Sequence, residues 1–268
     1  MNKPWLSRHV SLGALPWRAV TSMRSGRLWR PFVLVGALFI SLSLVSADDT
    51  KRPGTEGDKS GSNAVPEPKH SGGEPDGIVQ VANMVYAGTK SSQCFSDHFL
   101  IQAEKETAIS TSRRFHATKL GSEEVFGFPL VIMTGEGDFS LTDQERENLR
   151  QYIQGGGLLL ASAGCSSREW DRSFRREMAR IFPATEMRAL GLDHQVFHTV
   201  YDIKVLEAKH GKPRPLDGIV LDGRLGVVYS QDGLNDTAHT HGCCCCGGNE
   251  ITNCAQINVN ILAYALTY

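Results

Sequence analysis

Two short and almost continuous apolar runs most constrain the fold of this chain. Pro129–Thr134 and Leu158–Ala161 contain no charged residue, which is typical of strands that are covered on both faces. Between them, Thr142 precedes Glu145 by three residues, and this spacing predicts a capped helix that ends at the glycines 155–157. A strand, a helix and a second strand in succession predict a parallel sheet.

The flanking segments extend this alternation of strands and helices. We expect further strands at Ile78–Tyr86 and Arg114–Thr118, helices at 97–109 and from a cap at Asp171 to Pro183, a hairpin of 219–221 with 225–229 around Asp222-Gly223, and a closing helix at Ile251–Leu266. The sequence therefore predicts an α/β fold, a three-layer sandwich with a mostly parallel central sheet.

The first 47 residues have the composition of an export signal. They carry six basic residues and no acid, then the apolar run Phe32–Val45 and the small residues that end at Ala47. The run is shorter than the ~20 residues of a membrane-spanning helix. We expect cleavage after Ala47 and a periplasmic or secreted protein. The alternative is a signal anchor, in which residues 32–45 would be the protein's membrane attachment.

The composition of the rest predicts one acidic domain behind a linker. Residues 48–77 include 13 Gly, Pro or Ser and almost no large apolar side chain, so we expect a disordered linker. Residues 78–268 suit a single domain. Without its first 47 residues the chain keeps 22 Lys and Arg against 29 Asp and Glu, a formal charge of −7. This balance argues against nucleic acid as a partner.

A series of short motifs resembles those of one family. They are Thr134-Gly135-Glu136-Gly137-Asp138-Phe139, Leu149-Arg150-Gln151-Tyr152, Gly156-Gly157, residues 171–178, Phe182-Pro183, Leu192-Asp193-His194, Phe197-His198, Tyr201-Asp202 and residues 221–224. The domain resembles the domain of unknown function 4159 family, which belongs with the class I glutamine amidotransferase-like folds. The resemblance implies a glutamine amidotransferase-like, flavodoxin-like architecture and leaves the activity open.

The chain departs from this family pattern at positions where chemistry is expected. Glu136 stands where the family tends to have histidine, Ser162 and Ala163 replace an acidic pair, and Gln195 replaces a proline. The losses favour an exported, non-catalytic binding or accessory module with an unidentified ligand or protein partner. In such sheets ligands bind beyond the carboxyl ends of the strands. The candidate ligand-loop residues are therefore Gly135, Glu136, Gly137, Asp138, Ser162 and Ser166.

The alternative is a cysteine-dependent hydrolase or amidotransferase. Cys165 follows a buried strand in the loop where glutamine amidotransferase-like enzymes place their nucleophile, and His194 or His198 could supply the base. Against this, Ser167 occupies the position of the second glycine in a G-x-C-x-G elbow.

A dense group of thiols and imidazoles near the C-terminus predicts either a metal site or disulfides. Its members are His239, His241, Cys243, Cys244, Cys245, Cys246 and Cys254. Two or three of them could hold zinc or copper(I), which would suit a metal-handling protein. The alternative is disulfides, which export favours, and pairing with Cys254, Cys165 or Cys94 is possible.

Overall fold

The computed structural model describes residues 77–243 and 248–268. The predicted signal segment, nearly all of the predicted linker and Cys244–Cys246 lie outside these residues. Within the described ranges, no helix combines the length and the apolar character that crossing a membrane requires.

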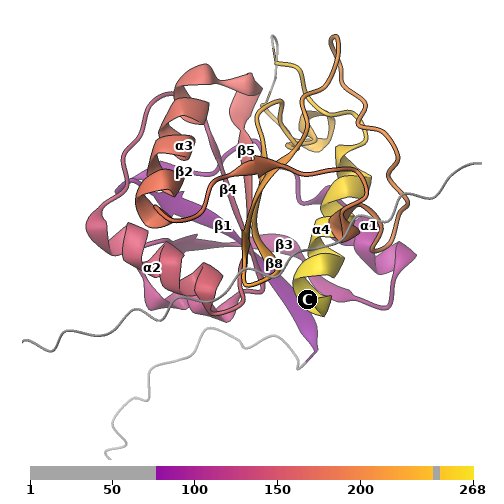
Figure 1. The fold of residues 1–268 in the computed structure, drawn as a ribbon. Helices are drawn as coiled ribbons and strands as arrows, with labels where there is room; N and C mark the ends of the chain where they lie inside the picture. The colour runs from indigo at the N-terminus through magenta and orange to yellow at the C-terminus, as the bar shows by residue number, and fades with distance from the viewer. Residues whose placement is uncertain (1–76, 244–247) are drawn as a thin grey trace, which may run out of the picture. The chain divides into compact units, whose positions relative to one another are not determined.

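A mixed sheet forms the centre of the described domain (Figure 1). Its eight strands are β1 Ile78–Tyr86, β2 Lys90–Ser91, β3 Ser110–Lys119, β4 Leu130–Gly135, β5 Leu158–Ala163, β6 Arg188–Ala189, β7 Asp217–Leu221 and β8 Arg224–Ser230. The order is β2-β1-β4-β5-β8-β7-β6, with β3 also paired to β1. The pairs β3–β1, β1–β4, β4–β5 and β5–β8 are parallel, and the short outer pairs are antiparallel. The prediction of an α/β fold with a mostly parallel central sheet is confirmed.

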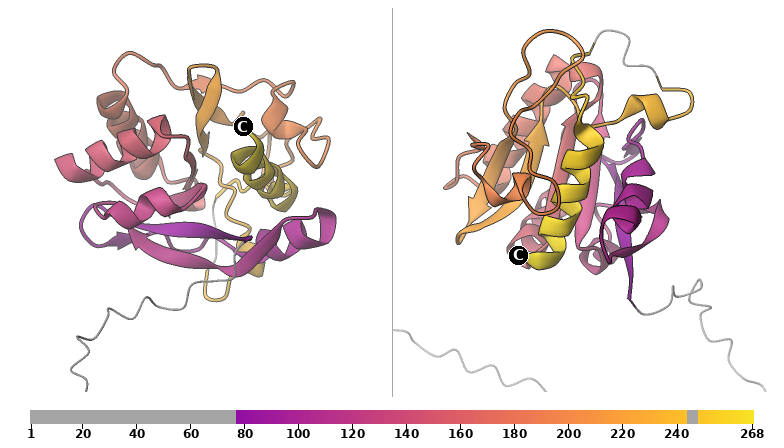
Figure 2. Two further views of the ribbon diagram at one scale, coloured as in Figure 1. Left: turned by 90° about the horizontal axis from the view of Figure 1, so that it is seen from below. Right: turned by 90° about the vertical axis from the view of Figure 1, so that its right-hand side faces the viewer.

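Four helices pack on the two faces of this sheet. They are α1 His98–Glu106, α2 Asp143–Gln154, α3 Arg168–Ile181 and α4 Cys254–Thr267. One apolar cluster contains buried residues of α1 and α4, and a second contains those of α2 and α3. Figures 1 and 2 show these pairs on opposite sides of the strands. Burial on both faces explains why β4 and β5 are apolar up to Thr134 and Ser162 near their carboxyl ends.

The start of α2 confirms the predicted capping box. The Thr142 Oγ1 atom accepts a hydrogen bond from the Glu145 backbone N–H (3.2 Å), and the Glu145 carboxylate accepts one from the Thr142 N–H (2.7 Å). Each side chain thus satisfies a backbone donor that the first helical turn leaves unpaired. After the helix, Gly156 adopts a φ of +110°, which favours glycine.

The predicted start of α3 was wrong. The helix begins at Arg168, and Ser167 caps it by accepting a hydrogen bond from the Trp170 N–H (3.2 Å). Asp171 lies inside the first turn, where its carboxylate accepts hydrogen bonds from Arg175 and Tyr229. Serine and aspartate are both good N-cap residues. The loop after β5 enters the helix at Ser167, so Ser167 and not Asp171 is the N-cap.

The predicted hairpin between β7 and β8 is confirmed. Asp222 and Gly223 have φ values of +50° and +81°, which are the two positive values of a type I′ turn. This turn places β7 antiparallel beside β8.

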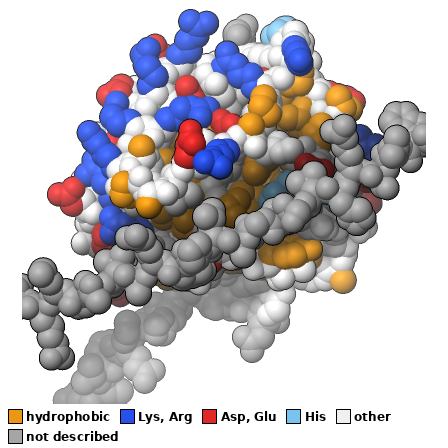
Figure 3. Space-filling view, in the orientation of Figure 1, with side chains coloured by type: hydrophobic (Ala, Val, Ile, Leu, Met, Phe, Trp, Pro, Cys, Tyr) orange, Lys and Arg blue, Asp and Glu red, His pale blue; other side chains and the backbone are white. Residues whose placement is uncertain are grey.

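The arginines of α3 are almost all paired with carboxylates. Arg172 pairs with Glu169, Arg175 with Asp171 and Asp217, Arg176 with Asp138, and Arg180 with Glu177. Figure 3 shows the basic side chains of this side of the molecule interspersed with acidic ones. The basic side chains of α3 thus belong to a charge-balanced helix face.

Candidate ligand site at the carboxyl edge of the sheet

The carboxyl ends of β4 and β5 are tied to the loop after β8 by Asn235. The Asn235 amide donates to Thr134 Oγ1 (3.0 Å) at the end of β4 and to the carbonyl of Cys94 (3.1 Å). Its amide oxygen accepts a hydrogen bond from Ser162 Oγ, and that hydroxyl accepts one from the Leu234 N–H (2.8 Å). Asn235 is 1 % exposed and Thr134 and Ser162 are 0 % exposed, so these three side chains are bonded to one another away from solvent.

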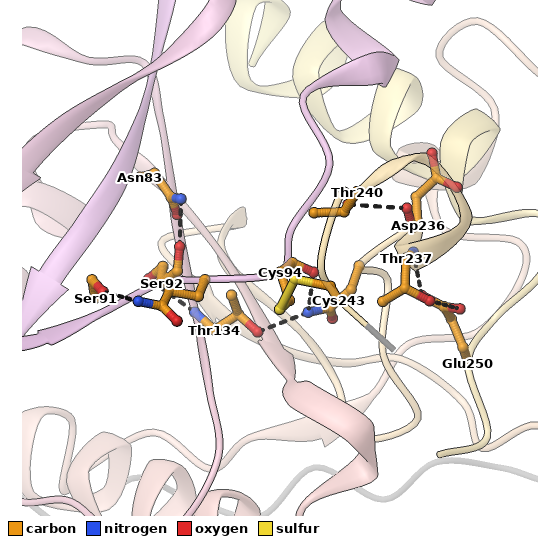
Figure 4. Close-up of a disulfide and its surroundings, with 12 residues drawn as sticks. Asn83, Ser91, Ser92, Cys94, Thr134, Asp236, Thr237, Thr240, Cys243 and Glu250 are labelled. Atoms are coloured by element: carbon orange, nitrogen blue, oxygen red, sulfur yellow. Dashed lines mark hydrogen bonds between the residues drawn. A yellow bond between two sulfur atoms is a disulfide. The ribbon is translucent and has the colours of Figure 1, made fainter. Parts of the chain in front are cut away.

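A disulfide joins the segment after β2 to the loop before α4. Cys94 and Cys243 are bonded across 149 residues, with a Cα–Cα distance of 5.5 Å. Figure 4 shows the bond beside Thr134, at the carboxyl edge of the sheet. The sequence left open whether this group pairs with Cys254, Cys165 or Cys94. Cys243 pairs with Cys94. Its sulfur is therefore engaged in a covalent bond and is not a thiolate ligand.

A hollow of about 290 Å³ opens at this edge. It is lined by two residues that follow β1, by the two disulfide cysteines and by the loops after β4 and β5: Ser91, Gln93, Cys94, Cys243, Gly135, Glu136, Gly164 and Cys165. The structure thus brings together the predicted loops after β4 and β5.

The backbone at Cys165 and Ser166 is left-handed and packs closely against Gly248 and Asn249. Cys165 and Ser166 have φ values of +49° and +54°, a conformation that costs free energy for side chains other than glycine. The Ser166 hydroxyl donates to the Asp232 carbonyl (3.1 Å) and accepts from the Asn249 N–H (2.8 Å). A Cβ at Gly248 would lie 2.8 Å from the Cys165 carbonyl carbon, so glycine is required there.

The loop 135–138 divides its polar residues between the hollow and α3. Glu136 is exposed and lines the hollow. Asp138 instead accepts a hydrogen bond from Ser173, which together with the Arg176 guanidinium lowers the pKa of its carboxyl. The Gly137 N–H donates to Ser167 Oγ (3.2 Å). Glu136 is therefore the charged side chain of this loop that a ligand in the hollow would meet.

His194 and His198 lie in another part of the fold. The His194 ring faces the Tyr264 ring at 5.9 Å, and Tyr264 bonds the backbone N–H of Leu225 at the start of β8. His198 bonds Asp202 and the carbonyl of Leu192. Because β8 runs parallel to β5, the start of β8 lies at the amino edge of the sheet, opposite Cys165. The structure therefore does not assemble the predicted pair of Cys165 with His194.

Among the described residues, the other predicted metal ligands, His239, His241 and Cys254, do not form one group of ligand atoms. Cys254 is 3 % exposed at the start of α4, and burial, followed by the charges of Asp236 and Glu250, raises the pKa of its thiol to about 12. His239 Nδ1 lies 2.8 Å from the Asp236 carboxylate, while His241 is exposed and lines a second, larger hollow.

Several site residues have no signal in the sequence. Asn235 and His98 are single polar residues whose partners lie 73 residues or more away in the sequence, and Asp236 bonds His239 three residues later. Only the parallel order of the strands, combined with the path of the last loop, places them together.

The strand order and the edge hollow define an α/β protein with a candidate small-molecule site at the carboxyl ends of its parallel strands. Residues 85–266 match the model of the family described as Domain of unknown function (DUF4159), and the chain belongs to this family. No curated protein matches the sequence.

We expect Asn235→Ala to destabilise the protein by about 2–3 kcal/mol, because the change removes the buried amide that bonds the hydroxyls of Thr134 and Ser162. Urea unfolding followed by tryptophan fluorescence measures this. Asn253→Ala removes the hydrogen bond that Asn253 donates to the exposed carbonyl of Val205 and the one that it accepts from the Glu207 N–H. This variant serves as the control and should cost less than about 1 kcal/mol. Equal losses in the two variants would contradict the assigned role of Asn235.

Proposed function

We propose that the protein is an exported, non-catalytic binding module whose ligand site is the 290 Å³ hollow at the carboxyl ends of β4 and β5. The observation that carries the proposal is the position of this hollow, because open α/β sheets bind ligands at this edge. The rigid frame around it, with a disulfide on one wall and the buried Asn235 network behind it, supports a pre-formed site.

The lining favours a small polar ligand. Its volume suits a molecule no larger than an amino acid or a monosaccharide. The Gln93 amide, the Ser91 hydroxyl and the Glu136 carboxylate offer hydrogen-bonding groups. Since Glu136 supplies a negative charge, a ligand with an amino group or several hydroxyl donors fits best.

Export and domain organisation belong to the same proposal. Residues 1–47 act as a signal peptide, or as an anchor through residues 32–45, residues 48–77 form a linker, and residues 78–268 form the domain. The Cys94–Cys243 disulfide supports an oxidising, extracytoplasmic location. The resemblance of the motifs and the helices on both sheet faces support a three-layer, flavodoxin-like fold of the glutamine amidotransferase-like superfamily.

The test is a thermal-shift screen of the oxidised full-length protein. The probes are the twenty free amino acids and a set of common hexoses, and we expect at least one to raise the unfolding midpoint. Gln93→Trp, which fills the hollow, should abolish the shift. Gln154→Trp makes the same change at the exposed end of α2 and should preserve it. If no probe shifts the midpoint, or if Gln93→Trp has no effect on the shift, the proposal fails.

One observation favours the second candidate, a cysteine-dependent hydrolase. The left-handed backbone of Cys165 lies between β5 and α3, and a turn of this kind between strand and helix presents nucleophiles in α/β hydrolases. In the described part of the chain, however, no histidine lines the hollow. Hydrolysis of p-nitrophenyl acetate that Cys165→Ala abolishes would favour the enzyme. We expect the wild type and the Cys165→Ala variant both to hydrolyse the ester only at the background rate.

A further inference from the structure

Two histidines that are far apart in the sequence meet at the edge of the fold beside an aspartate. His98 is the first residue of α1, and His239 ends the short 3-10 helix Thr237–His239. Their rings stack with centroids 4.3 Å apart and planes 10° apart. One ligand atom from each histidine and one from Asp236 lie within 4.8 Å of one another. We propose that His98, Asp236 and His239 form a zinc site.

The aspartate is held in place for this role. Its side chain is 10 % exposed, and both carboxylate oxygens lie within 2.9 Å of His239 Nδ1. Asp236 also has a φ of +52°, a conformation that aspartate tolerates better than most residues. A buried carboxylate with an imidazole as its close partner carries charge that a cation would neutralise.

His98 contributes a ring nitrogen that lacks a partner. Its Nδ1 atom is buried and forms no hydrogen bond with the described residues. Folded proteins pair the great majority of such atoms, so an exception calls for an explanation. A bound metal ion would give this imidazole a partner. Since an imidazole nitrogen binds a metal in the plane of its ring, the two rings must rotate out of their present stack to hold one ion.

The donor set favours zinc over calcium or magnesium. Two imidazole nitrogens and one carboxylate oxygen match the three protein ligands of open zinc sites, whereas hard cations prefer oxygen ligands alone. Zinc–ligand bonds of about 2.0–2.1 Å place two tetrahedral ligands roughly 3.3 Å apart. The present spread of up to 4.8 Å can close to this value by side-chain rotation.

The fourth coordination position would open toward a hollow. His98 and His239 line a cavity of about 430 Å³ together with His241, Arg113 and Arg114. The two guanidinium groups do not oppose a cation strongly, because Arg113 pairs with Glu104 and Arg114 with Asp97. The site is distinct from the 290 Å³ hollow, which lies beside the disulfide.

The Cys94–Cys243 disulfide preorganises this site. Cys94 precedes His98 by four residues, and Cys243 follows His239 by four, so the bond closes the two ligand-bearing segments onto each other. The Ser96 N–H donates to the Asn235 carbonyl (2.8 Å), and Ser96 Oγ donates to the His239 carbonyl (3.4 Å). Reduction of the disulfide should therefore weaken zinc binding.

The experiment measures zinc on the full-length, oxidised protein by elemental analysis and by competition with a chromogenic chelator. We expect one zinc ion per chain and a rise of roughly 5–10 °C in the unfolding midpoint when zinc exceeds the dissociation constant a hundredfold. Magnesium and calcium should give no shift. His98→Ala, Asp236→Asn and His239→Gln should each lower the zinc affinity at least tenfold, and reduction roughly 10–100-fold.

The matched control is His241→Ala, which removes an exposed imidazole from the same loop and should keep the zinc. His239→Gln keeps the test decisive if a buried change prevents folding, because the His239 side chain is about half exposed. A second control changes Cys244, Cys245 and Cys246 to serine. Zinc that survives His98→Ala and His239→Gln but disappears in the cysteine variant overturns the proposal, as does a wild-type protein that binds no zinc.

Discussion

Removal of the Cys94–Cys243 disulfide is expected to cost about 3–5 kcal/mol of the free energy of unfolding. The bond closes a loop of 149 residues, and the loss of loop-closure entropy in the unfolded chain grows with loop length. The double variant Cys94→Ser, Cys243→Ser should therefore unfold roughly 10 °C or more below the wild type. Urea unfolding under non-oxidising and non-reducing conditions gives the free-energy difference.

The control is the same pair of proteins in reductant. Once the bond is reduced in the wild type, the difference between the two proteins should shrink to the small effect of two Cys-to-Ser changes. A wild type that is no more stable than the double variant before reduction would show that the bond does not form in solution.

The second large effect is expected at Glu177, a fully buried carboxylate on α3. It accepts hydrogen bonds from Arg146 of α2 (2.7 Å) and from Arg180 (2.9 Å), and its side chain is 0 % exposed. Glu177→Gln keeps the shape and removes the charge, so Arg146 loses its buried partner. We expect the free energy of unfolding to fall by about 3 kcal/mol. This is at the lower end of the cost of breaking a buried ion pair, because Arg146 also pairs with Asp143. Urea unfolding at pH 7 measures it.

Glu169→Gln on the same helix is the matched control. Glu169 pairs with Arg172, but the two side chains are 57 % and 70 % exposed. Solvent screens such a pair, so the change should cost less than about 0.5 kcal/mol. If Glu177→Gln and Glu169→Gln lower the free energy of unfolding by the same amount, burial does not explain the contribution of the Glu177–Arg146 pair to stability.

Interactions between near neighbours in the sequence were predictable. Thr142 and Glu145 are three residues apart, and the capping box that they form depends on helix geometry alone. The two residues Asp222 and Gly223 specify their own turn. The apolar character of β4 and β5 required cover on both faces, which implied a parallel sheet with helices on either side.

The start of α3 shows where local signals become insufficient. Ser167 and Asp171 are both good caps, and the sequence favoured the second because a helical apolar pattern follows it. The structure uses Ser167, because its hydroxyl also receives the Gly137 N–H from the neighbouring loop. That loop is 30 residues away and becomes a neighbour only in the sheet.

The sequence by itself determined the fold class, the two loops at the carboxyl edge and the presence of a Cys/His-rich segment. The tertiary structure decided which residues meet there: Cys94 with Cys243, Asn235 with Thr134 and Ser162, and His98 with His239. Helix caps and turns depend on backbone geometry within a few residues. Contacts across 70–150 residues depend on strand order and on the path of the last loop, which no local spacing encodes.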